Sequence, residues 1–314
     1  MSIFQTKEWW STKVGQDEEF QPTHICIANI DNETPERPKL LVGSFSGYLR
    51  IYQPVRREFR IEDQLFEQGF GSPIIELQAG QFLLGDQNLY LALLFVKKIA
   101  IYSFVSNPKS GMASKLISEN ALARNAYNMT IGRFGGTKKD MICVQSCDGM
   151  LMVFEADKLS CMCQINDFVL PGPLVYYPVL DCFAIQNSNY EVEVYRYSSI
   201  GAIYNSSQKD SKKLQADWTF NVGEMANDMV LVKRSEKVQD LLVLSESMLF
   251  VISQNGTLKA QKKFDYTPMS IYVYQTGDPK AYADEAQRPL NFIIASTTHH
   301  IMVYSEFQLI WASK

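Results

Sequence analysis

The stretch Gly47-Tyr48-Leu49-Arg50-Ile51-Tyr52 is the first of six similar motifs that decide the fold. Each motif mixes apolar with other side chains and ends on a large apolar residue, and consecutive motifs end 41 to 57 residues apart. The other five are Lys98-Ile99-Ala100-Ile101-Tyr102, Gly149-Met150-Leu151-Met152-Val153-Phe154, Tyr190-Glu191-Val192-Glu193-Val194-Tyr195, Met248-Leu249-Phe250-Val251-Ile252 and His300-Ile301-Met302-Val303-Tyr304. Such a period is typical of architectures in which one supersecondary unit buries its apolar face only by stacking on its neighbours.

Four strand-like segments make up each repeat, and the motif is the third of them. In the third repeat the segments lie at residues 127–134, 141–146, 150–154 and 160–165. Ser46-Gly47, Asp148-Gly149 and Asn255-Gly256 provide hairpin turns, since these residues tolerate positive φ. Four short antiparallel strands, repeated, predict an all-β chain with a β-propeller fold. A β-sandwich would not repeat so regularly, a β-solenoid has shorter rungs, and the one helix signal, at residues 119–125, is weak.

We therefore expect one propeller domain over residues 1–314 with six four-stranded blades. Their predicted limits are residues 20–71, 72–123, 124–170, 171–222, 223–267 and 268–314. The segment from Ser2 to Trp10 also reads as an outer strand, but the sixth blade already has one near Leu309-Ile310-Trp311. Because propellers close by pairing their sheet edges, residues 1–19 are expected to hold the closing strand of a seventh, incomplete blade. Its other three strands would follow Lys314.

Composition narrows the class of protein. Hydrophobic residues are 46% and charged residues 20%, as in an ordinary globular protein, and the net charge of −4 gives no support for nucleic-acid binding. The longest apolar run, from Leu89 to Val96, is far below the ~18 residues that span a bilayer. The first twenty residues lack a secretory apolar region, and six cysteines are too few for a disulfide scaffold, so we expect reduced thiols in a cytoplasmic protein.

Residues that could carry chemistry are few. Phosphate-binding glycine motifs are absent, and Gly43-Ser44-Phe45-Ser46-Gly47 has Phe45 where a nucleophilic serine would stand. The histidines are His24, His299 and His300; the last two fall at a predicted hairpin turn. Cys143 with Cys147, and Cys161 with Cys163, are better explained as small apolar strand residues than as zinc ligands. We predict no catalytic, cofactor-binding or metal-binding residues, and hence a non-enzymatic protein without a cofactor.

Three further segments are candidates for contacts with partners. Residues 206–213, which include Lys209, Lys212 and Lys213, form a polar insertion in blade four. Residues 277–289 form an acidic loop in blade six. Trp9 and Trp10 are adjacent, so on a strand one would enter the core and the other would be packed by a neighbour or exposed to a partner.

Several stretches resemble one family, the parathyroid-hormone-responsive B1 protein family, whose members are subunits of the BBSome (the Bardet-Biedl syndrome complex). The most specific is Ile142-Cys143-Val144-Gln145-Ser146-Cys147-Asp148-Gly149-Met150-Leu151-Met152-Val153-Phe154-Glu155. Others are Glu8-Trp9-Trp10-Ser11-Thr12, the run from Val42 to Tyr52, the run from Asn128 to Gly136, Leu170-Pro171-Gly172-Pro173-Leu174 and the run from Asp217 to Glu224. They follow the family's order along nearly the whole chain, whereas an unrelated propeller would share only the period.

The resemblance implies a seven-bladed N-terminal propeller of a larger, non-enzymatic scaffold subunit. Such subunits build a coat complex that carries membrane proteins to and from cilia. The implied partners are other BBSome subunits and, through the complex, membrane-protein cargo and the membrane, without nucleic acid or a small-molecule substrate. The implied location is the cytoplasm, the cilium and its basal body. The chain departs from the family pattern in ending after six repeats.

Two other functions stay open at this level. A small-ligand or enzymatic propeller would need two or more carboxylates or histidines converging from the inner strands, and stretches such as Ile74-Ile75-Glu76-Leu77 offer few. Direct binding to a membrane surface through loop lysines is the third reading.

Overall fold

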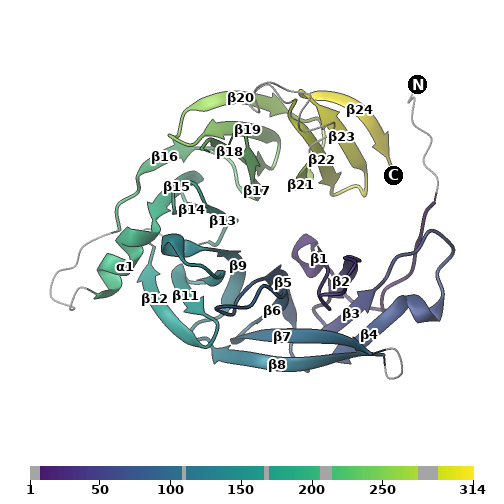
Figure 1. Ribbon diagram of the computed structural model, residues 1–314. Helices are drawn as coiled ribbons and strands as arrows, with labels where there is room; N and C mark the ends of the chain where they lie inside the picture. Colours follow the sequence, from purple (N-terminus) through teal and green to yellow (C-terminus); the bar gives the residue numbers. More distant parts are fainter. Residues whose placement is uncertain (1–7, 108–110, 166–169, 206–213, 236, 275–288) are drawn as a thin grey trace. The chain divides into compact units, whose positions relative to one another are not determined.

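The computed structural model describes residues 8–107, 111–165, 170–205, 214–235, 237–274 and 289–314 (Figure 1). Within these ranges the chain forms six antiparallel sheets of four strands each, and every sheet keeps its strands in chain order. The sheets are called blades one to six. Each lies inside one of the six ranges expected from the repeat. No helix among the described residues has the length and apolarity that crossing a bilayer requires.

The chain divides into two compact units, one within Lys7–Ile165 and one that contains Asn166–Lys314. The first holds β1 (Ile25–Ala28), β2 (Lys39–Gly43), β3 (Tyr48–Tyr52) and β4 (Gln64–Gly69); β5 (Ile74–Gly80), β6 (Tyr90–Phe95), β7 (Lys98–Asn107) and β8 (Gly111–Ala121); and β9 (Ala126–Gly132), β10 (Met141–Ser146), β11 (Met150–Glu155) and β12 (Lys158–Gln164). It also has three short 3-10 turns, η1 (Pro22–His24), η2 (Ile61–Asp63) and η3 (Phe134–Gly136).

The second unit holds blades four to six. Its strands are β13 (Leu174–Tyr177), β14 (Cys182–Gln186), β15 (Glu191–Arg196) and β16 (Trp218–Asn221); β17 (Ala226–Lys233), β18 (Gln239–Ser245), β19 (Met248–Ser253) and β20 (Leu258–Lys263); and β21 (Pro268–Tyr274), β22 (Asn291–Ser296), β23 (Ile301–Ser305) and β24 (Gln308–Ser313). One helix, α1 (Tyr197–Asn205), lies between β15 and β16.

The repeated motif forms the third strand of each blade. In five blades its pairing with the fourth strand shifts by one residue immediately before the motif's last residue, for example between Ile51 and Tyr52 and between Val303 and Tyr304. Such a bulge bends the outer strand and increases its twist. Blade four lacks the shift, since β15 pairs with β16 in an unbroken register. In five of the six blades the motif therefore marks a third strand with a bulge in the strand beside it.

Helix α1 was not predicted from the sequence. It follows β15 directly, and Ile200 is fully buried while Tyr197 packs edge-on against Phe183 with 6.3 Å between ring centroids. The apolar spacing Tyr197, Ile200, Tyr204 fits a helical face, but the segment is too short to show a clear period.

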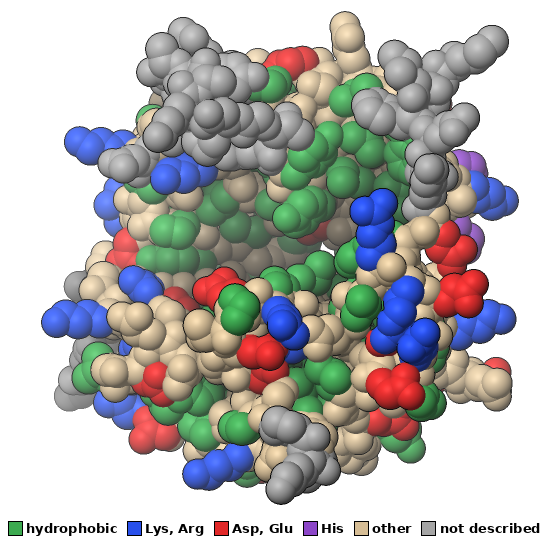
Figure 2. All heavy atoms as spheres, turned by 45° about the vertical axis from the view of Figure 1, so that its right-hand side comes forward, with side chains coloured by type: hydrophobic (Ala, Val, Ile, Leu, Met, Phe, Trp, Pro, Cys, Tyr) green, Lys and Arg blue, Asp and Glu red, His purple; other side chains and the backbone are tan. Residues whose placement is uncertain are grey.

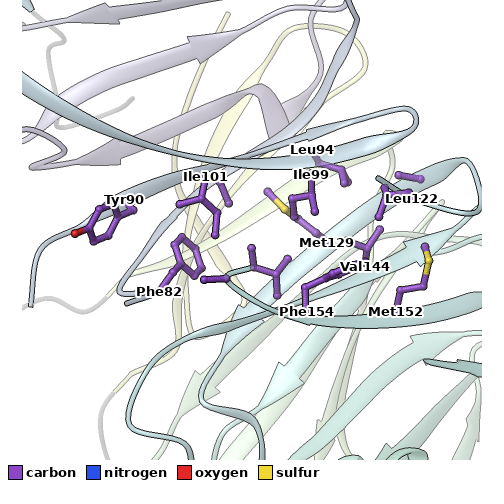
Figure 3. Packing of buried hydrophobic residues seen from close by; sticks show 14 residues of the cluster. Phe82, Tyr90, Leu94, Ile99, Ile101, Leu122, Met129, Val144, Met152 and Phe154 are labelled. Carbon is purple, nitrogen blue, oxygen red and sulfur yellow. The ribbon is translucent and has the colours of Figure 1, made fainter. Parts of the chain in front are cut away.

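Apolar side chains from consecutive blades interlock within each unit. One cluster joins blades two and three, and Figure 3 shows Leu94, Ile99 and Ile101 near Met129 and Val144. Similar clusters join blades one and two, four and five, and five and six. Burying one Leu, Ile, Val or Phe side chain contributes roughly 1.5–3 kcal/mol, so this packing stabilises each pair of blades.

Blade one contains a tightly packed glycine and a buried ion pair. Gly47 has φ of 81°, and a Cβ added there would lie 2.5 Å from the carbonyl oxygen of Ser72. The Lys39 ammonium, 1% exposed, donates to Asp31 Oδ1 at 2.6 Å and to Glu33 Oε2 at 3.1 Å. Asp31 also accepts from Ser106 Oγ at 2.6 Å, which ties β7 of blade two to blade one.

Candidate interaction surface

The residues considered for chemistry lie in places that do not favour catalysis. His24 is fully buried in η1, where its Nδ1 accepts the Gln21 N–H at 3.2 Å, and burial lowers its pKa below the usual 6.5. His299 and His300 lie at the β22–β23 turn, and His299 has φ of 61°. No group of three or more His, Cys, Asp or Glu side chains that could hold a metal occurs in the described ranges.

The cysteine thiols are mostly enclosed in sheets. Cys143, Cys161, Cys163 and Cys182 are buried, while Cys147 is exposed at the β10–β11 turn. Burial raises the pKa of the Cys143 thiol well above its usual value and raises the pKa of Cys182 to about 11. Protonated thiols are poor nucleophiles and poor metal ligands, so burial explains these residues as packing groups.

Carboxylates on the first strands of two blades bind the backbone of the next blade. Glu76 of β5, 6% exposed, accepts the Met129 N–H of β9 at 2.7 Å. Asp228 of β17 accepts the Ile271 N–H at 2.9 Å and Ser270 Oγ at 2.8 Å, both from β21. Burial is the main cause that raises the pKa of Asp228. These carboxylates stabilise contacts between blades.

One face of blade six carries apolar side chains that are still exposed. The other face contributes Ile271, Phe292, Ile294, Met302 and Tyr304 to the cluster with blade five. The register places Tyr272, Ile293, Val303 and Trp311 side by side in one row across β21, β22, β23 and β24. Ala295 and Ile301 are neighbours in the next row. We call these six residues the open face of blade six.

Exposure makes this face a candidate for binding. Tyr272 is 67% exposed and Ile301 49% exposed, which is unusual for large apolar side chains on a sheet whose other face is buried. Figure 2 shows that hydrophobic side chains gather over part of the described surface, with Lys, Arg, Asp and Glu side chains beside them. Apolar area bordered by charged residues is typical of protein-binding surfaces.

Blade one also has exposed apolar side chains on the face opposite its cluster with blade two. Ile25 and Ile27 of β1 are 57% and 71% exposed, and their neighbours on β2 are Val42 and Leu40. Farther along the same rows lie Arg50 and Tyr52 of β3. Trp10 and Glu18, which precede η1, contact Tyr52 and Arg50, while Tyr48 of β3 stays 40% exposed.

Trp10 and Glu18 both hold the N-terminal segment on blade one. Trp10 packs against Tyr52 and Phe59, each with 5.9 Å between ring centroids, and its Nε1 donates to Asp63 Oδ2 at 3.2 Å. Glu18 accepts two hydrogen bonds from the Arg50 guanidinium, at 2.7 and 3.1 Å, and these bonds lower the pKa of Glu18.

Most of the predicted N-terminal strand, Ser2 to Lys7, lies outside the described residues, so this strand stays a prediction. Its last three residues, Glu8 to Trp10, are not in a strand, and Trp10 packs on aromatic residues of blade one. Trp9 is 54% exposed, so the two tryptophans do have different surroundings, as expected. The insertion at 206–213 and residues 277–288 of the acidic loop also lie outside the described residues.

Comparison with known proteins identifies relatives along the whole chain. A family model described as PTHB1 N-terminal matches residues 1–314. The proteins PTHB1 of Mus musculus and Homo sapiens are each 34% identical to the chain over 333 residues, which cover all of this chain and 37% of each relative. A pthb1 homolog of Caenorhabditis elegans is 22% identical over 314 residues. The chain thus spans little more than a third of the length of these relatives.

Solved structures share the fold at low sequence identity. BBS1N, crystallised in complex with ARL6DN and soaked with mercury, has a TM-score of 0.64 and 9% identity over 93% of this chain and 81% of its own. Saccharomyces cerevisiae Sqt1 has a TM-score of 0.62 and 10% identity over 86% of this chain and 69% of its own. With the six four-stranded blades, this likeness confirms the predicted β-propeller fold class. The family match and the 34% identity to its members show that the chain belongs to the PTHB1 N-terminal family.

Proposed function

We propose that the protein is a non-enzymatic interaction scaffold and a subunit of the BBSome coat complex, which moves membrane proteins to and from cilia. The observation that carries the proposal is the PTHB1 family match along residues 1–314. A propeller of the same fold, BBS1N, was crystallised with a protein partner, ARL6DN. Binding of proteins is therefore a role that this fold supports.

The surface of the molecule supports a binding role in physical terms. The open face of blade six presents Tyr272 and Ile301 to solvent, and covering them would bury further apolar area. In contrast, the inner-strand carboxylates Glu76 and Asp228 already accept backbone N–H groups from the next blade. A small-ligand or enzymatic propeller needs such groups converging and accessible, so the observations favour the scaffold.

The proposed partners are other BBSome subunits, with membrane-protein cargo and the membrane reached through the assembled complex. The proposed location is the cytoplasm, with enrichment at the cilium and its basal body. No cofactor, nucleic acid or small-molecule substrate enters this proposal.

Affinity purification from ciliated cells tests the assignment. The tagged full-length protein should recover BBSome subunits well above an untagged control. Two apolar-to-charged variants refine the test: Ile301→Lys on the open face and Leu116→Lys on β8, which are matched at 49% and 47% exposure. We expect Ile301→Lys to lower recovery severalfold relative to Leu116→Lys, because a charge on the open face would disturb the contact that covers it in the full-length protein, whether a further blade or a partner subunit makes that contact. Failure of the wild-type protein to recover any BBSome subunit would contradict the proposed function.

A further inference from the structure

The outer strand of blade six has an edge unlike most others in the protein. β24 pairs with β23 on one side and has no strand on its other side among the described residues. Its sequence, Gln308-Leu309-Ile310-Trp311-Ala312-Ser313, contains no charged residue and no proline. Leu309 and Ile310 are 54% and 42% exposed. Such an edge presents unpaired backbone N–H and C=O groups beside apolar side chains.

The outer strands of four other blades carry charges that discourage further strand pairing. Glu67 lies on β4, Lys115 and Glu119 on β8, Lys158 on β12, and Lys259, Lys262 and Lys263 on β20. Charged residues, especially lysine, are a common means by which natural sheets protect their edges. β16 is also uncharged, but it has only four residues, against six in β24.

The outer strands of blades five and six differ most clearly at the extra residue of their bulges. In β20 the extra residue lies between Ala260 and Leu258 and is Lys259, which reaches Asp240 Oδ1 at 2.7 Å. In β24 the extra residue lies between Trp311 and Leu309 and is Ile310. The position that holds a paired lysine in blade five therefore holds an exposed aliphatic side chain in blade six.

The side chains of β24 also indicate what would pair with it. Trp311 ends the row of Tyr272, Ile293 and Val303, so a residue opposite Trp311 on an added strand would extend an apolar row. Pairs of aromatic and β-branched side chains on neighbouring strands stabilise a sheet by roughly 0.2–1 kcal/mol each. Because β24 offers no charge, a charged side chain on the added strand would find no partner on β24 itself.

We propose that the β24 edge binds an extended, uncharged segment of a partner protein, which adds to blade six as a fifth strand. Main-chain hydrogen bonds hold the segment, and a β-branched or aromatic residue packs beside Trp311. This binding site is a separate proposal from the scaffold role. The protein could assemble with ciliary subunits without binding a strand at β24, and it could bind a strand at β24 without assembling with those subunits.

A fluorescent, capped peptide that alternates valine and threonine is a suitable probe. Its binding to the purified protein is measured by fluorescence anisotropy, and hydrogen exchange locates the protected amides. Ile310→Lys gives β24 the residue type found at the blade-five bulge, and Leu258→Lys on β20 is the matched control at 40% exposure. Equal melting temperatures of the two variants and the wild type show that the fold is kept.

We expect the peptide to slow exchange of the β24 amides, and Ile310→Lys to weaken binding by about tenfold or more, with Leu258→Lys near wild type. A peptide with a central proline should bind more weakly, because it lacks a backbone donor. No binding, protection away from β24, or equal binding by Ile310→Lys would overturn the proposal. So would self-association through β24 that excludes the peptide, since the occupant would then be a second copy of the chain.

Discussion

Replacement of Glu76 by alanine tests whether the inner-strand carboxylates serve the fold. Glu76→Ala removes the acceptor of the buried Met129 N–H, now at 2.7 Å, and of the Gln78 side-chain amide at 2.6 Å. A hydrogen bond to a charged group contributes about 1.5–3 kcal/mol, and a buried N–H without a partner costs about 1–3 kcal/mol. These two values describe largely the same lost hydrogen bond and are not added, so we expect a loss of about 3 kcal/mol in the free energy of unfolding.

The assay combines urea unfolding with hydrogen exchange at the Met129 amide. A loss of about 3 kcal/mol corresponds to roughly a hundredfold faster exchange if that amide exchanges through the same opening. Glu76→Gln keeps an oxygen acceptor for the Met129 N–H, so it should lower the free energy of unfolding less than Glu76→Ala does. Glu119→Ala is the surface control, because its pair with Lys98 is partly exposed on both sides and should contribute below about 1 kcal/mol.

The opposite result would have a clear meaning. A carboxylate reserved for a ligand or for catalysis is held at a cost to stability, and its removal leaves stability unchanged or raises it. If Glu76→Ala is as stable as the wild type and Met129 exchanges at the wild-type rate, the structural role of Glu76 is wrong.

Three further predictions concern blade one. Burial favours the neutral form of His24 and lowers its pKa, so its contribution to the free energy of unfolding should be fully present above pH 6.5 and should decrease as the pH falls from 6.5 toward the lower folded-state pKa. Urea unfolding at pH 7.5 and 5.5 should therefore show a larger loss of stability at the lower pH for the wild type than for His24→Gln. Equal losses would contradict this prediction. Lys39→Met should lower the free energy of unfolding by about 3–5 kcal/mol, because Asp31 then stays buried without its cation. Adding Asp31→Asn should restore part of this loss, measured by thermal unfolding. If Lys39→Met alone leaves stability unchanged, the buried ion pair is contradicted. Gly47→Ala should destabilise the protein at least twice as much as the control Gly71→Ala. Gly71 has φ of 66° but no atom within 4 Å of an added Cβ, so its replacement should cost only the backbone strain, about 1–2 kcal/mol. Similar melting temperatures of the two variants would contradict the close contact at Gly47.

Much of the fold could be predicted because the motif combines a period with turn residues. Tyr52 and Tyr304 are buried at the ends of third strands, as the repeat indicates, and each blade lies within its expected range. The bulge before these residues could not be foreseen, because it depends on pairing between strands and not on periodicity along one. Helix α1, in the connection between β15 and β16, was also missed, because its short apolar pattern is too weak to distinguish from a strand.

The candidate surface was less predictable than the fold. An alternating strand such as Ile301 to Ser305 reads the same whether its second face meets solvent, a neighbouring blade or another protein. The register and the exposure of Ile301 separate these cases. Trp10 shows the same limit, since its packing on Tyr52 and Phe59 joins residues 42 and 49 positions apart in sequence.

The open face of blade six offers apolar side chains on which the expected seventh blade could pack, and the free energy of that packing can be estimated. Burying a large apolar side chain contributes roughly 1.5–3 kcal/mol in full, so covering the exposed parts of Tyr272 and Ile301 alone would contribute roughly 2–3 kcal/mol. A further blade supplied by a longer chain, as the greater length of the relatives allows, would provide this cover.

The central claim is that the open face of blade six is a contact surface. Thermal unfolding tests it most directly, with this chain compared to a longer natural form that continues for about fifty residues, which is near the repeat length. Hydrogen exchange at β21 and β23 is followed in both. We predict that the longer form melts cooperatively at a higher temperature and protects the amides of these two strands, while the 314-residue chain is less stable or aggregates. Equal melting temperatures, with a monomeric 314-residue chain and unchanged exchange, would contradict the claim.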